Sequence, residues 1–240
     1  MPDHARHLAG EAALEHLVRA HHHAAFFWVV SDRVADRQAE RTEDVVALRR
    51  MLLRAWSLSL SEALGDPERA RHAIARDLAA WRRGVALDRA LYARRRMTPA
   101  EYRRSVGLRL RCVTTCTRAL LEARSLRGDA AALVRVSDLF LMACQCRDDA
   151  LDVAEDRATR GASVPDLLGL VPGALVRAGA RLAWGAHREA ARAGFGAYAS
   201  WLHGFAREAD VGLLGSDTAA QVFGAFALVD GMRHVAGGFT

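Results

Sequence analysis

Apolar residues recur every three to four positions along most of the chain, which is the spacing of one face of an α-helix. No stretch shows the alternation of apolar and polar residues, bounded by turn signals, that indicates a β-strand. The pattern therefore predicts an all-α chain of eight or nine helices. The longer predicted helices span residues 12–36, 43–64, 69–96, 173–192 and 198–209.

Capping signals predict several helix ends. Gly65-Asp66-Pro67 ends one helix and starts the next, which we expect to be one helix or a pair bent at Gly84. Thr98, followed by Pro99 and Glu101, predicts a capping box for a helix that includes residues 102–111.

The second half of the chain is read in the same way. Gly128-Asp129 predicts the start of a helix that runs into an acidic segment at 145–156, and a polar loop is expected over 157–165. Pro172 starts a further helix, and a last one is expected between Ser216 and Gly238. No internal repeat or long linker interrupts the pattern, so we expect one domain over residues 1–240.

The net charge of +6 comes from a chain whose basic side chains, apart from histidine, are all arginine. We interpret these arginines as scattered singly, which does not favour a nucleic-acid partner. Residues 1–10 lack the apolar core of a signal peptide, and the longest apolar run, 24–30, is too short to span a bilayer. These observations predict a cytoplasmic protein without an integral membrane segment.

Cysteine and histidine offer weaker candidates for metal binding. The spacings of Cys112 and Cys116 and of Cys144 and Cys146 match no zinc ribbon or finger, so reduced core thiols are favoured over a zinc site. The histidines at 21–23 could ligate a metal, but an exposed or half-exposed helix segment is the favoured interpretation.

Three aspartates at four-residue spacing form the strongest chemical signal. Asp148, Asp152 and Asp156 would share one helix face, where like charges repel unless something compensates them. Mg²⁺ is a common compensation, because it prefers carboxylate and phosphate oxygens. A solvated acidic face is the alternative, but the apolar segment 139–143 just before the cluster favours a helix that enters a core.

A second acidic face is predicted near the end of the first helix. Asp32 and Asp36 are again four residues apart, and Glu40 continues the same face. The chain therefore carries two aspartate helices that are far apart in sequence.

The two motifs resemble those of the class I isoprenoid synthases, which comprise the trans-prenyl diphosphate synthases and the terpene synthases. Gln145-x2-Asp148-Asp149-x2-Asp152-x3-Asp156 is similar to the second aspartate-rich motif FQxxDDxxDxxxD, with Cys144 in place of the phenylalanine. The same aspartates align with the NDxxSxxxE motif of terpene synthases. Residues 163–170, SVPDLLGL, are similar to the TYPxLLGL segment that follows in prenyl synthases.

The resemblance implies an isoprenoid synthase-type helical bundle with a central active-site cavity. Two departures bear on the activity. Ser31 replaces the leading aspartate of the first motif, and the basic GGKRxRP segment that holds isopentenyl diphosphate is missing. The second departure favours an enzyme that acts on one allylic diphosphate.

The resemblance also implies roles for individual residues. It implies that Asp148, Asp149 and Asp152 are catalytic. The implied ligands of Mg²⁺, three ions together with the bound diphosphate, are Asp32, Asp36, Asp148, Asp152 and Asp156. The implied diphosphate contacts are Arg109, Arg103, Arg104, Arg157 and Arg160. The expected lining of the cation pocket is Phe26, Phe27, Trp28, Phe140 and Gln145, with Trp56 and Trp81 as further candidates and plain core packing as the alternative for each aromatic.

Three functions follow as hypotheses. The first is ionisation of an allylic prenyl diphosphate and cyclisation or elimination to a terpene. The second is prenyl transfer to an acceptor, including short-chain prenyl diphosphate synthesis. The third is a non-catalytic helical subunit of a related synthase. The expected partner is an allylic isoprenyl diphosphate, and apolar helices are compatible with a homodimer.

Overall fold

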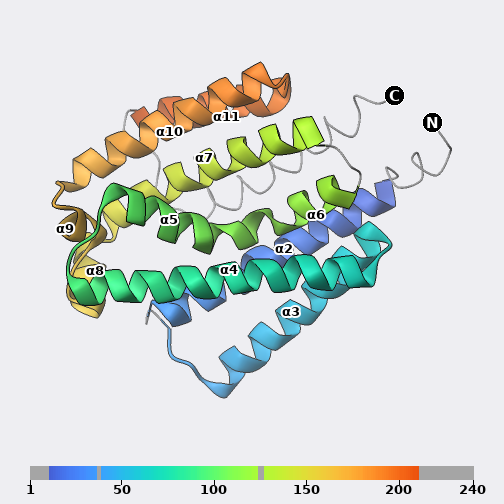
Figure 1. Cartoon of the computed structure of the whole chain (residues 1–240), viewed down its shortest axis with the longest axis horizontal. Helices are drawn as coiled ribbons and strands as arrows, with labels where there is room; N and C mark the ends of the chain where they lie inside the picture. The colour runs from blue at the N-terminus through green and yellow to red at the C-terminus, as the bar shows by residue number, and fades with distance from the viewer. Residues whose placement is uncertain (1–10, 37–38, 124–126, 211–240) are drawn as a thin grey trace.

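Helices are the only regular elements in the part of the chain that the structure describes, so the all-α prediction is confirmed. The structure is a computed structural model, and it describes residues 11–36, 39–123 and 127–210 (Figure 1). Its helices are α2 (Glu11–Ala35), α3 (Glu43–Leu64), α4 (Pro67–Arg94), α5 (Pro99–Leu110), the 3₁₀ helix η1 (Arg111–Thr114), α6 (Thr115–Ala123), α7 (Arg127–Leu151), α8 (Val153–Arg160), α9 (Val164–Leu168), α10 (Pro172–Arg192) and α11 (Gly196–Asp210).

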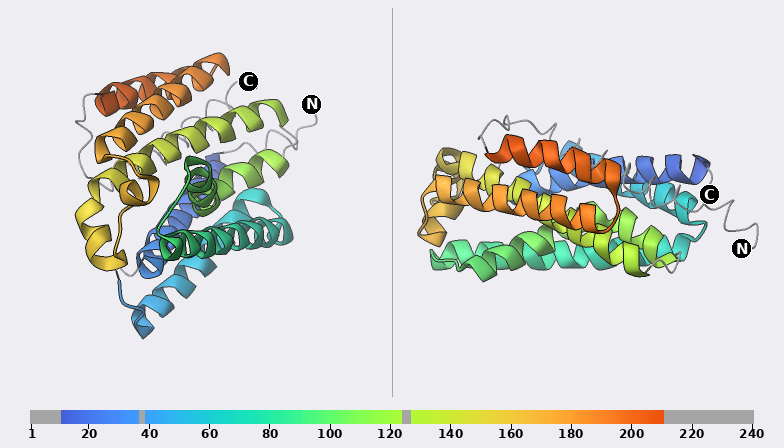
Figure 2. Two further views of the ribbon diagram at one scale, coloured as in Figure 1. Left: turned by 60° about the vertical axis from the view of Figure 1, so that its left-hand side comes forward. Right: turned by 90° about the horizontal axis from the view of Figure 1, so that it is seen from above.

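The long helices run roughly side by side as a bundle, with α5 and α6 between α7 and α4 (Figure 1). On one side of α7 lies α10, which also packs against α11 (Figure 2). Helix α5 packs against both α7 and α4, and α3 packs against both α4 and α2. The short helices α8 and α9 close one end of the bundle (Figure 1).

Side-chain caps explain why the predicted helix ends are largely correct. The Thr42 hydroxyl accepts a hydrogen bond from the backbone N–H of Val45, and Gly65 ends the same helix with a φ of 63°. The capping box of Thr98 and Glu101 is present at the start of α5. These signals act over three or four residues, so they can be read without knowing the fold.

Gly84 does not separate two helices, because α4 is continuous from Pro67 to Arg94. A Cβ at Gly84 would lie 2.9 Å from Cγ of Arg109 and 3.0 Å from Cβ of Leu108. The glycine therefore allows α4 and α5 to approach closely at the place where Arg109 enters the interior.

The prediction of a polar loop over residues 157–165 is wrong. Helix α8 extends to Arg160, Gly161 ends it with a φ of 78°, and α9 already begins at Val164. The acidic segment is also divided, because α7 ends at Leu151 and α8 begins at Val153. The backbone N–H of Asp152 still donates to the carbonyl of Asp148, and that of Asp156 to the carbonyl of Asp152, so the helical path is nearly continuous.

The main hydrophobic core lies between α2, α3, α6, α7, α10 and α11. Trp56, Phe140 and Tyr198 are among its largest fully buried side chains. A second apolar cluster lies under the end closed by α8 and α9, and it includes Leu91, Tyr102, Val106, Cys146, Val164, Leu167 and Leu175. This second cluster holds α4, α5, α7 and α9 together next to the acidic segment.

Other predictions have mixed outcomes. His21 is buried, 1% exposed, so the exposed or half-exposed segment predicted there is wrong for this residue. All four cysteines are free thiols.

Within the described residues, no helix has the combination of length and apolar character that crossing a bilayer requires. The helix predicted between Ser216 and Gly238 lies outside the described residues.

Candidate functional site

The two acidic segments lie at the same end of the bundle. The C-terminal end of α2 carries Asp32 and Asp36, and it lies at the end where α7 joins α8 (Figure 1). Their charges influence each other, because the negative charge of Asp32 helps to raise the pKa of Asp148, and that of Asp36 helps to raise the pKa of Asp156. The fold therefore brings together acidic residues that are more than a hundred positions apart in sequence.

Arg109 lies between α2 and α4 and forms ion pairs with both. Its Nη2 donates to Asp32 Oδ2 at 2.7 Å and to Asp36 Oδ2 at 2.8 Å, and its Nη1 lies 3.7 Å from Asp88 Oδ2. Only 8% of Arg109 is exposed. The residue to which the resemblance assigns a diphosphate contact is therefore held by Asp32 and Asp36.

Arg160 forms the second cationic centre at this end of the bundle. Its Nη2 donates to the carboxylate of Asp88, and its Nη1 lies 3.8 Å from Asp36 Oδ1. Its guanidinium lies over the ring of Tyr92, 3.5 Å from the ring centroid, a cation–π geometry. The Tyr92 hydroxyl donates to Asp156 Oδ2 at 3.3 Å, which links Arg160 to the second aspartate motif.

Asp149 is held on both of its oxygens. The hydroxyl of Tyr102 donates to Oδ2 at 2.6 Å, and Nε2 of Gln145 donates to Oδ1 at 2.9 Å. Burial raises the pKa of Asp149 to about 7, against these hydrogen bonds, which lower it. Asp149 thus fixes α7 against α5, whereas no described side chain donates a hydrogen bond of this kind to its neighbour Asp148.

The pKa values of the remaining motif aspartates are also raised. Burial and the charge of Asp152 raise the pKa of Asp148 to about 6. Burial raises the pKa of Asp156 to about 6, although Arg160 opposes the shift. Burial and Glu155 raise the pKa of Asp152. The ionised forms of these carboxyl groups are therefore less stable in the folded chain than they would be in water.

We call this group the acidic site, and it has fewer cations than anions. It contains seven carboxyl groups and two guanidinium groups, from Asp32, Asp36, Asp88, Asp148, Asp149, Asp152, Asp156, Arg109 and Arg160. Among the described residues, no three His, Cys, Asp or Glu side chains are already close enough to hold a metal ion. The oxygen donors nevertheless suit Mg²⁺, which commonly takes only one or two carboxylates and completes its shell with water and phosphate oxygens.

The other predicted arginines lie outside this group. Arg103 and Arg104 are exposed on α5. Arg157 is exposed and forms a bidentate ion pair with Asp166, with Nη2 2.6 Å from Oδ1 and Nε 2.8 Å from Oδ2. Only Arg109 and Arg160, of the five predicted diphosphate contacts, join the acidic site.

The aromatic residues expected to line a pocket lie mainly in the core. Phe26 is 60% exposed on the outside of α2. Phe27 and Trp56 pack against each other, as do Trp28 and Trp81. Phe140 packs edge-on against Trp201 and Phe205. Gln145 is the one residue of the expected lining that contacts the acidic site, through Asp149.

Sequence reasoning missed Asp88 and Tyr92, both on α4. A signal for Asp88 exists, because Trp81, Gly84, Asp88 and Leu91 recur at the spacing of one helix face and are all buried. An aspartate in such a stripe needs a cationic partner. The partner, Arg160, comes from α8 and follows only from the fold.

The chain matches no known family, and no curated protein or solved structure is similar enough to count as a match. The fold and the acidic site define an all-α protein with an anion-rich polar centre at one end of a helical bundle.

Proposed function

We propose that this protein is a class I isoprenoid synthase of the terpene synthase type. It would ionise an allylic prenyl diphosphate in a Mg²⁺-dependent step and then cyclise the allylic cation or eliminate a proton from it. The observation that carries the proposal is the meeting of both aspartate motifs with the buried Arg109 and the half-buried Arg160 at one end of a helical bundle.

The excess of negative charge supports a cation-binding role. Asp148 and Asp156 have pKa values near 6 because burial and neighbouring anions disfavour their ionised forms. A divalent cation would relieve this repulsion. A solvated acidic helix face would not raise these pKa values, because water would stabilise the charges.

The residues that would hold Mg²⁺ are Asp148, Asp152 and Asp156, with Asp32 and Asp36 opposite them. When bound, Mg²⁺ supplies positive charge that stabilises the diphosphate as a leaving group. Asp149 would position Asp148 without contacting substrate, because Tyr102 and Gln145 already occupy both of its oxygens.

Arg109 and Arg160 would bind the remaining phosphate oxygens. Both are paired with aspartates, so contact with a phosphate would require each guanidinium to exchange or share a carboxylate partner. Asp88 lies within ion-pair distance of both arginines and would keep them oriented during this exchange. Guanidinium groups placed in a buried, preorganised site stabilise developing negative charge more strongly than they would in water.

The test is incubation of the purified chain with Mg²⁺ and geranyl, farnesyl or geranylgeranyl diphosphate, each with and without isopentenyl diphosphate. A hydrocarbon or terpene alcohol formed from a single diphosphate is the expected result. Elongated diphosphates would instead indicate chain synthesis. Absence of diphosphate release from all three substrates would contradict the proposal and favour a non-catalytic subunit.

Variants connect the activity to the acidic site. Asp148→Ala and Asp152→Ala should each lower Mg²⁺-dependent turnover at least ~100-fold, because each removes a proposed metal ligand. Glu208→Ala is the matched control, since Glu208 is an exposed acidic residue on α11, outside the acidic site. Near-full activity of either aspartate variant would refute the metal assignment.

A further inference from the structure

Positive charge is concentrated on the hairpin of α4 and α5. Residues 67–111 contain thirteen arginines and four acidic residues, a net charge of +9, whereas the whole chain carries +6. The rest of the chain is therefore net −3. The interpretation that the arginines are scattered singly along the chain is wrong for this hairpin.

Between Arg71 and Ala93, the exposed residues on one face of α4 are arginine and alanine, and the half-buried Leu78 lies between Arg71 and Arg82. Arg71, Arg82 and Arg89 are separated by eleven and seven residues, which places them in line along the helix, and all three are exposed. The exposed alanines of the same face are Ala75, Ala86 and Ala93. From Arg71 to Arg89 this row extends about 27 Å at 1.5 Å per residue.

The acidic residues of the hairpin do not neutralise this row. Asp77 and Asp88 are buried and are paired with arginines on the inner side. Glu68 lies next to His72, and Glu101 is paired with Arg94. Within the described residues, Arg71, Arg82 and Arg89 form no ion pair.

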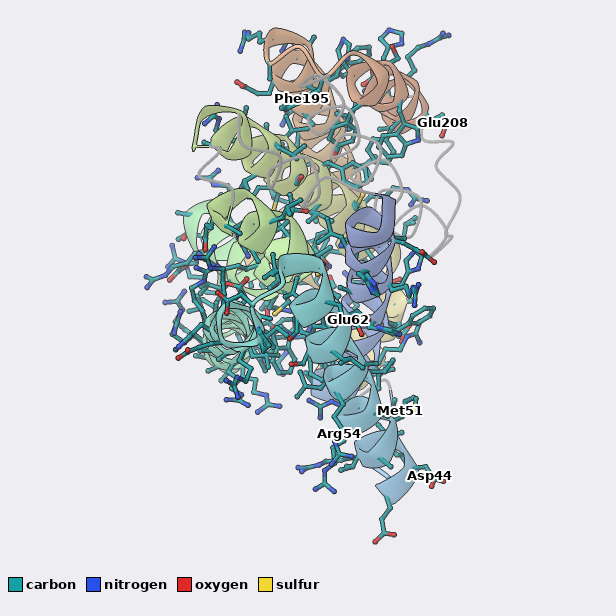
Figure 3. All side chains as sticks on the ribbon, turned by 90° about the vertical axis from the view of Figure 1, so that its right-hand side faces the viewer. Asp44, Met51, Arg54, Glu62, Phe195 and Glu208 are labelled. Carbon is teal, nitrogen blue, oxygen red and sulfur yellow. The ribbon has the colours of Figure 1, made fainter. Side chains whose placement is uncertain are left out.

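Neighbouring elements extend the basic surface. Arg83 on α4 and Arg103 and Arg104 on α5 are exposed. On the α3 side, nitrogen-tipped side chains gather around α4, and Arg54 points toward them, whereas Met51 points to the opposite side of α3 (Figure 3). We call the exposed arginines of α4 and α5 the arginine face.

We propose that the arginine face docks on the surface of an anionic lipid bilayer. A helix with exposed guanidinium groups in a row and mainly small side chains between them can contact several phosphates at once. Arginine binds phosphate through paired N–H donors, and each basic residue near an anionic membrane surface contributes to binding.

The composition of α4 disfavours a nucleic-acid partner. Helix α4 contains no Ser, Thr, Asn or Gln, so it lacks the amide and hydroxyl side chains that commonly read base edges. Its aromatic residues, Trp81 and Tyr92, contact Trp28 and Arg160 on the inner side, so they are not placed to stack on bases. The arginine face therefore lacks the amide, hydroxyl and aromatic side chains that nucleic-acid binding proteins commonly use beside arginine.

The test is co-sedimentation of the full chain with vesicles of phosphatidylcholine alone and of phosphatidylcholine with phosphatidylserine in equal parts. We expect binding to the anionic vesicles only, and release at ~1 M salt, where the Debye length is about 3 Å. The variant Arg71→Ala/Arg82→Ala/Arg89→Ala should bind on the order of 100-fold more weakly, since each arginine contributes roughly a fivefold factor. Alanine favours exposed helix positions, so the variant should remain folded.

The matched control is Arg181→Ala/Arg188→Ala/Arg207→Ala, which removes three exposed arginines from α10 and α11. It should lose less than about fivefold in affinity. An equal loss in both variants would show that only overall charge matters and would overturn the docking surface. Tighter binding to duplex DNA or RNA at the same salt would overturn the lipid assignment. The assay contains no prenyl diphosphate, so its outcome is independent of the proposed activity.

Discussion

Replacing Asp148 with asparagine should stabilise the fold at neutral pH while abolishing Mg²⁺-dependent turnover. Burial and the negative charges of Asp152, Asp32 and Asp156 raise the pKa of Asp148 from 3.8 to about 6. At pH 7 the folded chain therefore carries an ionised carboxylate that costs about 3 kcal/mol relative to the unfolded chain. Asparagine has the same shape and no charge, so we expect Asp148→Asn to gain about 1–3 kcal/mol of unfolding free energy.

The stability gained by Asp148→Asn should depend on pH. Because the folded-state pKa lies above the unfolded value, the folded chain binds the extra proton, and the penalty is absent below about pH 4 and complete above about pH 6. The gain from Asp148→Asn should therefore be largest at about pH 7.5 and should disappear by about pH 4. Urea unfolding followed by far-ultraviolet circular dichroism at several pH values measures it.

Two outcomes would refute this reasoning. A loss of stability in Asp148→Asn at neutral pH would mean that the carboxylate is satisfied in the folded chain. A gain in unfolding free energy of equal size at about pH 7.5 and at about pH 4 would mean that the effect does not come from the charge of Asp148. The control is Asp44→Asn, because Asp44 is exposed in the first turn of α3. Its negative charge there interacts favourably with the positive N-terminal end of the helix dipole. This control should lose no more than about 0.5 kcal/mol.

Two further predictions concern packing and buried histidine. Gly84→Ala should destabilise the chain by about 1–3 kcal/mol in urea unfolding, because its Cβ would clash with Arg109 and Leu108, whereas Gly107→Ala, which meets nothing within 4 Å, should be neutral or slightly stabilising. Among the described residues, neither ring nitrogen of His21 has a hydrogen-bond partner, and burial lowers its pKa to about 4, so the stabilising contribution of the neutral imidazole is complete above pH 6.5 and is lost as the pH falls. Between about pH 7 and about pH 5, the unfolding free energy of the wild type in urea should fall by about 2 kcal/mol more than that of His21→Leu. Equal losses in the two proteins would contradict a buried neutral imidazole.

The sequence predicted most of the helices because their ends are set by local chemistry. The bounds of α3 follow from Thr42 and Gly65, which lie next to the helix that they cap. The loop expected at 157–165 shows the limit of this reasoning. Polar composition indicated a loop, but α8 continues until Gly161 adopts the left-handed conformation, and α9 follows within three residues.

Sequence spacing identified the carboxylates of the acidic site but not their partners. Four-residue periodicity places Asp148, Asp152 and Asp156 on one face whatever the fold is. The ion pairs of Arg109 with Asp32 and Asp36 join residues 77 and 73 positions apart, so they depend on how α2 and α5 cross. No local pattern contains that information.

The inner and outer faces of α4 lie next to charges of opposite sign. On the inner face, Asp88 contacts Arg160 and lies 3.7 Å from Arg109, which leaves these arginines less able to compensate the second aspartate motif. A sequence selected only for stability would gain by removing one of these carboxylates, because uncompensated like charges cost free energy. On the outer face the opposite imbalance occurs, since Arg71, Arg82 and Arg89 form no ion pair with any described residue. Opposite charges are thus left unneutralised on the two sides of one helix, and the simplest physical reason is that each side binds something of the opposite sign.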